Sequence, residues 1–265
     1  MAKGKRSTLG GELRFFALLA LGVLIVRSFI VTPFFIPSES MLPRLLIGDY
    51  LVVQKWPYGF SRWSLPWGLP LIPGRIFADT PERGDVVVFR SPEEPTGGGS
   101  HDVIKRVIGL PGDTIRMRRG QLILNGRPVP KLRIADFTVP ESPNYACPDT
   151  FETVVAGETL CRFQRFRETL PGGRSYDVLD LAQGSDGDDT GLFTVPAGHV
   201  FLMGDNRDNS ADSRFAPPVG MGFIPIERVQ GRAGLSVFST DGSAEYWKPW
   251  TWVSAARPER IGEGF

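Results

Sequence analysis

The chain opens with one long, almost unbroken apolar stretch and then changes to short apolar runs separated by polar turns. From Leu13 to Val31 the main interruptions are Arg27 and Ser28. At about 1.5 Å per residue, a helix of this length spans roughly the 30 Å of a hydrocarbon core. Arg27 lies near one end, where its stem can extend to the headgroup layer. The pattern therefore predicts a transmembrane helix over residues 13–32, after a short segment of residues 1–12.

A cleaved secretory signal is the alternative, because Phe15 to Val26 has the length of a signal h-region. No small-x-small cleavage pattern follows before Pro33, which favours an uncleaved anchor. Only Arg27 is basic at the far end of the span, whereas four basic residues precede it. These four are Lys3, Lys5, Arg6 and Arg14. The positive-inside rule then predicts a cytoplasmic N-terminus and the export of residues beyond Thr32.

Past the anchor, β-branched and aromatic runs alternate with turn signals such as Asn125-Gly126 and Pro111-Gly112. High glycine and proline counts, 31 and 23, fit strands and turns better than long helices. We find no repeat at solenoid or propeller periods. The pattern predicts a mainly β fold with an antiparallel sheet. The predicted strands cover residues 50–54, 85–89, 103–108, 121–124, 193–195, 200–203 and 233–238.

The sequence also suggests how these strands are divided. Polar, Gly- and Asp-rich stretches make residues 121–197 looser than their flanks, so we predict a smaller β subdomain inserted there. The core would then be formed by residues 33–120 and 198–265, the latter including a C-terminal tail. Residues 56–77 are rich in Pro, Gly and Trp and are interpreted as a surface excursion. A flexible loop is expected at residues 91–100, since its glycines lack the Lys-Ser/Thr of a phosphate-binding loop.

Composition narrows the class of function. A formal net charge of +1 gives no electrostatic reason to expect nucleic acid as a partner. Cys147 and Cys161 lie in the exported part, where a disulfide would close a loop worth about 3 kcal/mol in the chain-entropy model. Two free buried thiols remain the alternative. His101 and His199 are the only histidines and no ligand cluster is evident, so no metal or cofactor is expected. We expect a monomer.

Ser40 is the first candidate for chemistry, a few residues beyond the anchor. An isolated serine indicates nothing, because most serines are solvated or cap an element. Here Pro37 and Pro43 stiffen the backbone around the hydroxyl. Ser38 adds a second hydroxyl, on the same side if the segment is extended. A fixed pair of hydroxyls just outside a bilayer is what this segment predicts.

Lys105 is the candidate base for that serine. It shares one face of a predicted strand with Val103 and Val107, which favours its desolvation. To act near neutrality, its pKa must fall about three units from about 10.4, which corresponds to about 4 kcal/mol. The alternative is an edge-strand lysine that prevents aggregation. Neither histidine lies in a recognisable triad setting, so a Ser40–Lys105 pair is the leading arrangement.

The segment from Gly204 to Phe215 is the most specific. Its alternating acids and amides suggest an EF-hand loop, but Ser210 stands at the glycine position and Ala216 at the closing glutamate position. Asp and Arg at this spacing can instead form a buried ion-pair network beside a site. Ser210 would there help to orient a neutral lysine.

Taken together, these segments resemble the type I signal peptidases of bacteria. The resemblance rests on four stretches in order after the anchor, whereas the inserted region carries little signature. These stretches are Ile36-Pro37-Ser38-x-Ser40-Met41, Arg83–Phe89, Lys105-Arg106-Val107-x-Gly109-x-Pro111-Gly112-Asp113 and Gly204-Asp205-Asn206-x-x-x-Ser210-x-Asp212-Ser213-Arg214. The resemblance implies Ser40 as nucleophile and Lys105 as general base. It also implies an oxyanion site from the Ser40 N–H and the Ser38 hydroxyl, with Ser210 hydrogen-bonded to Lys105.

Other matched positions are given supporting roles by the same resemblance. Asp212 and Arg214 would support the loop, whereas we interpret Asp205 and Arg106 as structural. The family often has Gly between the two serines, where this chain has Glu39. Its side chain is expected to point away from the nucleophile if the segment is extended.

The resemblance further implies preprotein signal peptides as substrates, cleaved after small-x-small sites. In an extended peptide, residues two apart share one face, so two shallow apolar pockets can read both small side chains. Plain core packing is the alternative for each residue matched to these pockets. The matched residues are Phe34, Ile36, Met41, Leu45, Val88 and Ile104. The implied location is the bacterial inner membrane, with the catalytic domain on its outer, periplasmic face.

Two tryptophan-rich segments, residues 56–67 and 247–252, can lie at the lipid bilayer surface or pack in a core. Two other functions stay open from the sequence. One is a dedicated Ser-Lys protease that matures a single pilin or conjugation protein. The other is a membrane-anchored β scaffold without activity, although the joint presence of Ser40, Lys105 and Ser210 argues against it.

Overall fold

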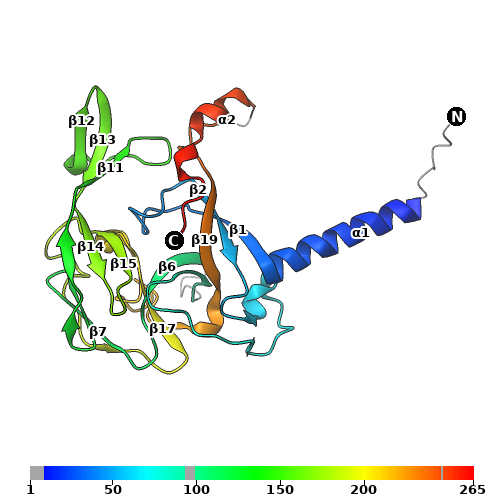
Figure 1. The fold of residues 1–265 in the computed structure, drawn as a ribbon, viewed down its shortest axis with the longest axis horizontal. Helices are drawn as coiled ribbons and strands as arrows, with labels where there is room; N and C mark the ends of the chain where they lie inside the picture. The colour runs from blue at the N-terminus through cyan, green and yellow to red at the C-terminus, as the bar shows by residue number, and fades with distance from the viewer. Residues whose placement is uncertain (1–8, 93–98, 246) are drawn as a thin grey trace.

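The apolar stretch forms a helix that projects away from the rest of the chain (Figure 1). The structure, a computed structural model, describes residues 9–92, 99–245 and 247–265. Helix α1 (Leu9–Ile25) continues as the π-helical segment η1 (Val26–Ile30), and this combined helix is long and apolar enough to cross a membrane. No residue of α1 is buried. Three of the basic residues on which the predicted orientation rests, at positions 3, 5 and 6, lie outside the described residues.

Beyond η1 the main chain enters a curled, seven-stranded antiparallel sheet with the order β1-β2-β19-β5-β6-β17-β18. Each of the seven strands predicted from the sequence is present, with ends shifted by a few residues, and five of them belong to this sheet. Its strands are β1 (Val31–Phe35), β2 (Asp49–Gln54), β5 (Val86–Arg90), β6 (Asp102–Gly109), β17 (His199–Met203), β18 (Ile224–Pro225) and β19 (Val229–Ser239). The predicted mainly β fold with one N-terminal apolar helix is confirmed.

Smaller sheets occupy the region predicted as an insertion, and one of their strands, β7, lies before its predicted start at residue 121; the domain boundaries remain predictions. One has the order β16-β7-β8-β9, another β10-β14-β15, and a third β11-β13-β12. Their strands are β7 (Thr114–Arg118), β8 (Gln121–Leu124), β9 (Arg127–Pro128), β10 (Lys131–Arg133), β11 (Phe137–Pro140), β12 (Glu152–Val155), β13 (Glu158–Phe163), β14 (Arg165–Thr169), β15 (Ser175–Leu179) and β16 (Phe193–Thr194). The strands β3 (Phe60–Ser61) and β4 (Arg75–Ile76) pair within the predicted surface excursion.

The remaining helical segments are short. The C-terminal helix α2 (Trp250–Ala255) lies at the top of Figure 1, beyond the end of β19. Single 3-10 turns are η2 (Arg62–Ser64), η3 (Pro66–Gly68), η4 (Asp149–Phe151), η5 (Arg207–Asn209), η6 (Ile226–Arg228) and η7 (Pro258–Arg260).

The run Val86–Phe89 is apolar at every position because both faces of β5 are covered. Val86 and Val88 belong to one buried cluster, and Val87 and Phe89 to another. Each such side chain contributes about 1.5–3 kcal/mol relative to an exposed position. Full burial on both faces holds the two central strands, β5 and β6, rigidly in place.

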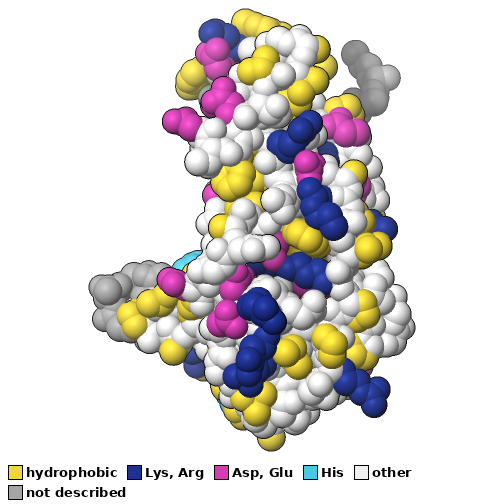
Figure 2. Space-filling view, turned by 90° about the vertical axis from the view of Figure 1, so that its left-hand side faces the viewer, with side chains coloured by type: hydrophobic (Ala, Val, Ile, Leu, Met, Phe, Trp, Pro, Cys, Tyr) yellow, Lys and Arg dark blue, Asp and Glu magenta, His cyan; other side chains and the backbone are white. Residues whose placement is uncertain are grey.

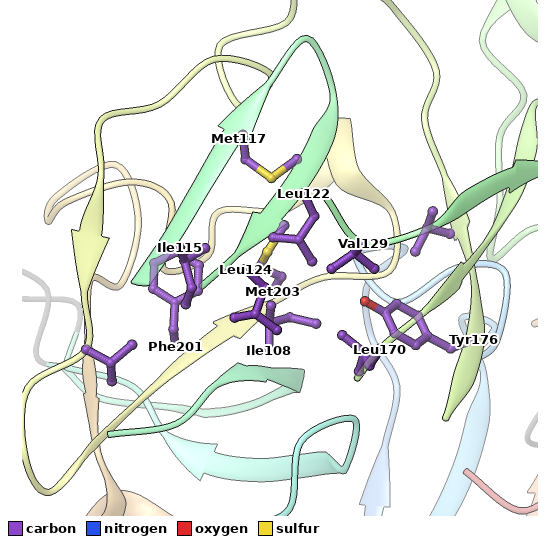
Figure 3. Close-up of a cluster of buried hydrophobic side chains, with 12 residues drawn as sticks. Ile108, Ile115, Met117, Leu122, Leu124, Val129, Leu170, Tyr176, Phe201 and Met203 are labelled. Carbon is purple, nitrogen blue, oxygen red and sulfur yellow. The ribbon is translucent and has the colours of Figure 1, made fainter. Parts of the chain in front are cut away.

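A third buried cluster joins the β7–β8 hairpin to the main sheet (Figure 3). In Figure 3, Leu122 and Leu124 of the hairpin point toward Ile108 of β6 and Met203 of β17. Tyr176 of β15 closes the cluster on one side. The sheets of the predicted insertion therefore pack directly on the strand that carries the candidate base.

Cys147 and Cys161 form a disulfide, as expected for an exported domain, so the alternative of two free thiols is not what the structure has. Figure 2 shows the face of the molecule that points away from α1, where Lys and Arg side chains alternate with acidic ones. This distribution agrees with a net charge near zero.

Candidate active site

The structure brings Ser40 and Lys105 into direct contact, although 65 positions separate them. The Lys105 Nζ lies 2.7 Å from the Ser40 Oγ and donates a second hydrogen bond to the carbonyl of Ile104 at 3.0 Å. Only 8% of Ser40 and 3% of Lys105 are exposed. The pair is therefore shielded from bulk water, and its separation suits proton transfer between hydroxyl and amine.

Burial makes the Lys105 amine bind a proton less strongly than an ordinary lysine does. Desolvation lowers the pKa of Lys105 to about 8, although the carboxylates of Asp212 and Asp205 oppose the shift. Near pH 8 about half of the amines are therefore neutral. A neutral amine can accept the proton of the Ser40 hydroxyl across the 2.7 Å contact.

The loop after β17 positions the serine. Strand β17 pairs with β6 only as far as Met203 opposite Arg106, so the chain after Met203 runs toward Ser40. The Asn206 N–H donates to the Ser40 carbonyl at 3.1 Å, and its side chain donates to the Glu39 carbonyl at 3.2 Å. The Ser40 N–H itself donates to none of the described residues, so it remains free to bind a ligand.

The Glu39 carboxylate accepts a hydrogen bond from the Asn209 side chain. Its side chain therefore turns toward the loop and away from the Ser40 hydroxyl, in the direction expected from the sequence. The glutamate that replaces the family's usual glycine thus adds a contact that holds the serine segment against the loop.

Asp212 and Arg214 form a fully buried ion pair at 2.9 Å. Burial pushes the pKa of Asp212 upward, but Arg214 and two backbone N–H donors outweigh it and hold the pKa below its usual value. The carboxylate near Lys105 therefore stays ionised. The Arg214 guanidinium also donates to the Arg207 carbonyl at 2.5 Å, which fixes the turn of the loop.

Two further buried ion pairs hold this loop, one to β6 of the main sheet and one to β14 of a smaller sheet. Arg106 donates two hydrogen bonds to Asp205, at 2.7 and 2.6 Å, and its guanidinium lies 4.4 Å from the Tyr176 ring centroid. Arg207 binds Glu168 through two contacts at 2.7 and 2.5 Å. Removing one partner of such a pair leaves a buried charge unpaired and typically costs about 3–5 kcal/mol. These contacts agree with structural roles for Arg106 and Asp205.

Ser210 departs from the expected role. Its hydroxyl is buried but makes no hydrogen bond with any described residue, so the expected bond to Lys105 is not formed. The Lys105 amine instead points toward the Ile104 carbonyl and Ser40. Ser38 does lie beside Ser40, with 3.4 Å between the two hydroxyl oxygens.

Gly204 allows the loop to approach the serine. A Cβ added at this position would lie 2.3 Å from the Ser210 Oγ and 2.5 Å from the Ser40 carbonyl oxygen. The sequence motif contains this glycine and Asn206, but its spacing alone does not show that both contact the serine segment. Gly204 and Asn206 come close to the serine segment because β17 stops pairing with β6 just before them, at Met203.

We expect Gly204→Ala to move Ser40 away from Lys105, because the added Cβ would lie 2.5 Å from the Ser40 carbonyl oxygen and the backbone must shift to relieve that contact. Overpacking of this kind typically costs about 1–3 kcal/mol, and peptidase activity should fall strongly in protein that remains folded. Gly191→Ala is the matched control, since no atom lies within 4 Å of its added Cβ. Measuring thermal unfolding and peptide cleavage separates the two effects; equal activity of both variants would contradict the role given to Gly204.

The structure also gathers the six residues predicted to bind substrate. Five of them are members of one buried cluster, and the sixth, Phe34, packs against it. The five are Ile36, Met41, Leu45, Val88 and Ile104. The same cluster also contains Leu51, Val53, Val86 and Ala233, so the six predicted residues are part of the core as well.

Three carboxylates outside this region lie close enough to hold a cation, namely Asp180, Asp188 and Asp208. Each already has protein partners. Asp180 pairs with Lys131, and the other two accept backbone N–H groups of residues 181–185. A cleft of about 800 Å³ lined largely by arginines likewise excludes Ser40 and Lys105.

Comparison with known proteins agrees with this geometry. Residues 11–238 match the family described as signal peptidase, peptidase S26. Signal peptidase I of Rickettsia typhi is 36% identical over 225 residues, which cover 82% of this chain and 75% of the relative. The Rickettsia canadensis protein of the same name is 37% identical over 241 residues, covering 88% and 81%.

A solved signal peptidase I from Enterococcus faecalis is 25% identical and covers 58% of this chain and 97% of its own, with a TM-score of 0.29. That score is too low to support an argument about the fold. The sequence matches establish the family without it, because they cover most of both chains at more than 35% identity. The chain belongs to the signal peptidase I family, peptidase S26.

Proposed function

We propose that the protein is a membrane-anchored endopeptidase that removes signal peptides from exported preproteins after small-x-small sites. Membership of the family supports signal-peptide cleavage by a peptidase. The finer proposal, a Ser-Lys mechanism, is carried by the 2.7 Å contact between Ser40 and a buried Lys105. Ser40 is the nucleophile and neutral Lys105 is the general base.

The reaction proceeds in two halves. The Ser40 Oγ attacks the carbonyl carbon of the scissile bond while its proton passes to the Lys105 Nζ. The free Ser40 N–H and the Ser38 hydroxyl donate to the oxyanion of the tetrahedral intermediate. Lys105 then returns the proton to the leaving amine, which leaves an acyl-enzyme ester on Ser40. Lys105 next removes a proton from the water that attacks this ester and passes it to the Ser40 Oγ, which releases the signal peptide as a carboxylic acid and restores the serine hydroxyl.

The sheet offers two open edges to an extended substrate. β1 is a terminal strand, and β6 pairs with β17 only from Arg106 onward, which leaves residues 102–105 free on that side among the described strands. In a peptide strand that pairs with either edge, alternate side chains point to the same face. Two side chains that are two positions apart would then both face the apolar cluster around Ile36 and Ile104. Because these residues are nearly fully buried, we propose that the peptide meets only shallow depressions over them, which would favour small side chains.

The membrane arrangement is part of the same proposal. The helix Leu9–Ile30 would anchor the chain with a cytoplasmic N-terminus and the catalytic domain on the outer face of the bacterial inner membrane. At least half of each of four tryptophans is exposed, which favours a bilayer-facing role over core packing. These are Trp56, Trp67, Trp247 and Trp250. We propose that the protein acts as a monomer.

The test is cleavage of a peptide with an Ala-x-Ala site by the full chain in detergent. We expect a single cut after the second alanine, located by mass spectrometry, and loss of cleavage when that alanine is replaced by leucine. A cut at another position, or equal cleavage of the leucine peptide, would contradict the proposed specificity. If only one member of a panel of signal peptides is cut, the protein is a dedicated maturation protease.

A further inference from the structure

Lys55 is a buried cation that the proposed mechanism does not use. Only 3% of the residue is exposed, and its amine donates to the Gln230 side chain at 3.3 Å. No carboxylate among the described residues lies within ion-pair distance of it. Burial lowers the pKa of Lys55 to about 8, with opposing attraction from Asp102 and added repulsion from Arg27. A lysine in this position is costly to keep unless an anion reaches it.

The lysine lines a cavity of about 160 Å³, next to Arg27 and Ser28 at the end of the helical span. Asp102 also lines it, but the carboxylate is occupied by Arg90 at 3.1 Å and by the Gln230 side chain. Two cations, Arg27 and Lys55, therefore face the cavity without a carboxylate partner among the described residues. A single water needs only about 10–15 Å³, so the cavity has room for a phosphate group.

The cavity lies at the level where the proposed span leaves the bilayer. Trp63, Pro66 and Trp67 line it, and 90% of Trp67 is exposed. The backbone of Trp67 has φ = 56°, a conformation that side chains rarely adopt, and the following glycine also has a positive φ. The fold thus holds this indole outward, and tryptophan is favoured at the membrane–water interface.

We propose that this cavity binds the phosphate of an anionic phospholipid headgroup, with Lys55 and Arg27 as its ligands. The bilayer is the source because the cavity opens beside the membrane-spanning helix rather than on the face away from it. Phe34 and Val88 line both this cavity and the proposed substrate pocket. A bound headgroup would therefore lie next to the signal peptide, although headgroup binding itself does not depend on the proposed peptidase activity.

Lipid binding to the full chain in detergent, measured by native mass spectrometry, tests this site. We expect phosphatidylglycerol to bind at least about tenfold more tightly than phosphatidylcholine, because both lipids carry a phosphate but only phosphatidylcholine adds a choline cation, which Lys55 and Arg27 repel. Lys55→Met should remove this preference and Lys55→Arg should keep it. Lys248→Met is the matched control, since it removes an exposed lysine beside the other tryptophan segment.

Arg27→Gln, at an exposed position, is a second variant that should lose the preference even if Lys55→Met does not fold. Inorganic phosphate that competes with phosphatidylglycerol would support recognition of the phosphate group. Three results would overturn the proposal: no preference in the parent, an unchanged preference in Lys55→Met, or an equal loss in Lys248→Met. Binding of inorganic phosphate without binding of phosphatidylglycerol would overturn the bilayer as its source.

Discussion

Lys105→Met is expected to lower kcat/KM for an Ala-x-Ala peptide by at least about 10³-fold, because the Ser40 hydroxyl then has no base in contact with it. Ser40→Ala should lose at least as much, since no acyl-enzyme can form. The losses caused by removing two groups that act as one unit are not additive. The double variant should therefore have about the same kcat/KM as the less active of the two single variants. Steady-state cleavage by the full chain in detergent gives all three values.

Two controls keep this result interpretable. Lys248→Met removes an exposed lysine and Ser254→Ala an exposed serine, both outside the site, so neither should change kcat/KM. Thermal unfolding shows whether each active-site variant is folded. Cleavage that survives both Ser40→Ala and Lys105→Met would rule out the dyad, whereas an inactive parent chain would favour the scaffold interpretation.

Lys105→Met should also make the folded protein more stable at neutral pH. The folded-state pKa of Lys105, about 8, lies below the ordinary value of 10.5. Below pH 8 the lysine is charged in both states, and the folded state carries the full cost of burying that charge. As pH rises from 8 to 10.5, the folded state has already lost the proton and the unfolded state still holds it, so the cost disappears. The shift corresponds to about 3 kcal/mol.

Relative to Lys105→Met, the parent should therefore gain about 3 kcal/mol of unfolding free energy in total as pH rises, most of it between pH 8 and 10.5. Denaturant unfolding of both proteins at a series of pH values measures the difference and cancels other titrating groups. Lys248→Met should show no such trend against the parent, because that lysine is exposed. A difference independent of pH would mean that Lys105 is not desolvated in the folded state.

The sequence predicts best those features that depend on local periodicity. The unbroken apolar stretch identifies the helix, and β-branched runs identify the main strands. Val86–Phe89 illustrates why this works: burial on both faces demands apolar residues at every position. Short strands such as β9 and β10 leave no comparable pattern, since two or three residues with mixed exposure carry too little periodicity.

The sequence predicted which residues form the site, but it did not predict all the contacts between them. The resemblance named Ser40 and Lys105, and the structure brings the two side chains into contact. It did not reveal that Glu168 pairs with Arg207, because that contact joins the inserted region to the loop across 39 positions. Nor could it show how the Ser210 hydroxyl is oriented, which depends on packing against Gly204. Such contacts follow from tertiary packing rather than from local sequence.

The central claim is that a neutral Lys105 activates Ser40, and the pH dependence of kcat/KM tests it most directly. We predict that kcat/KM for an Ala-x-Ala peptide falls about tenfold per pH unit below the lysine pKa of about 8 and is level above it. The acid limb should follow one ionisation of the free enzyme. A profile that stays flat well into acidic pH would contradict a lysine base.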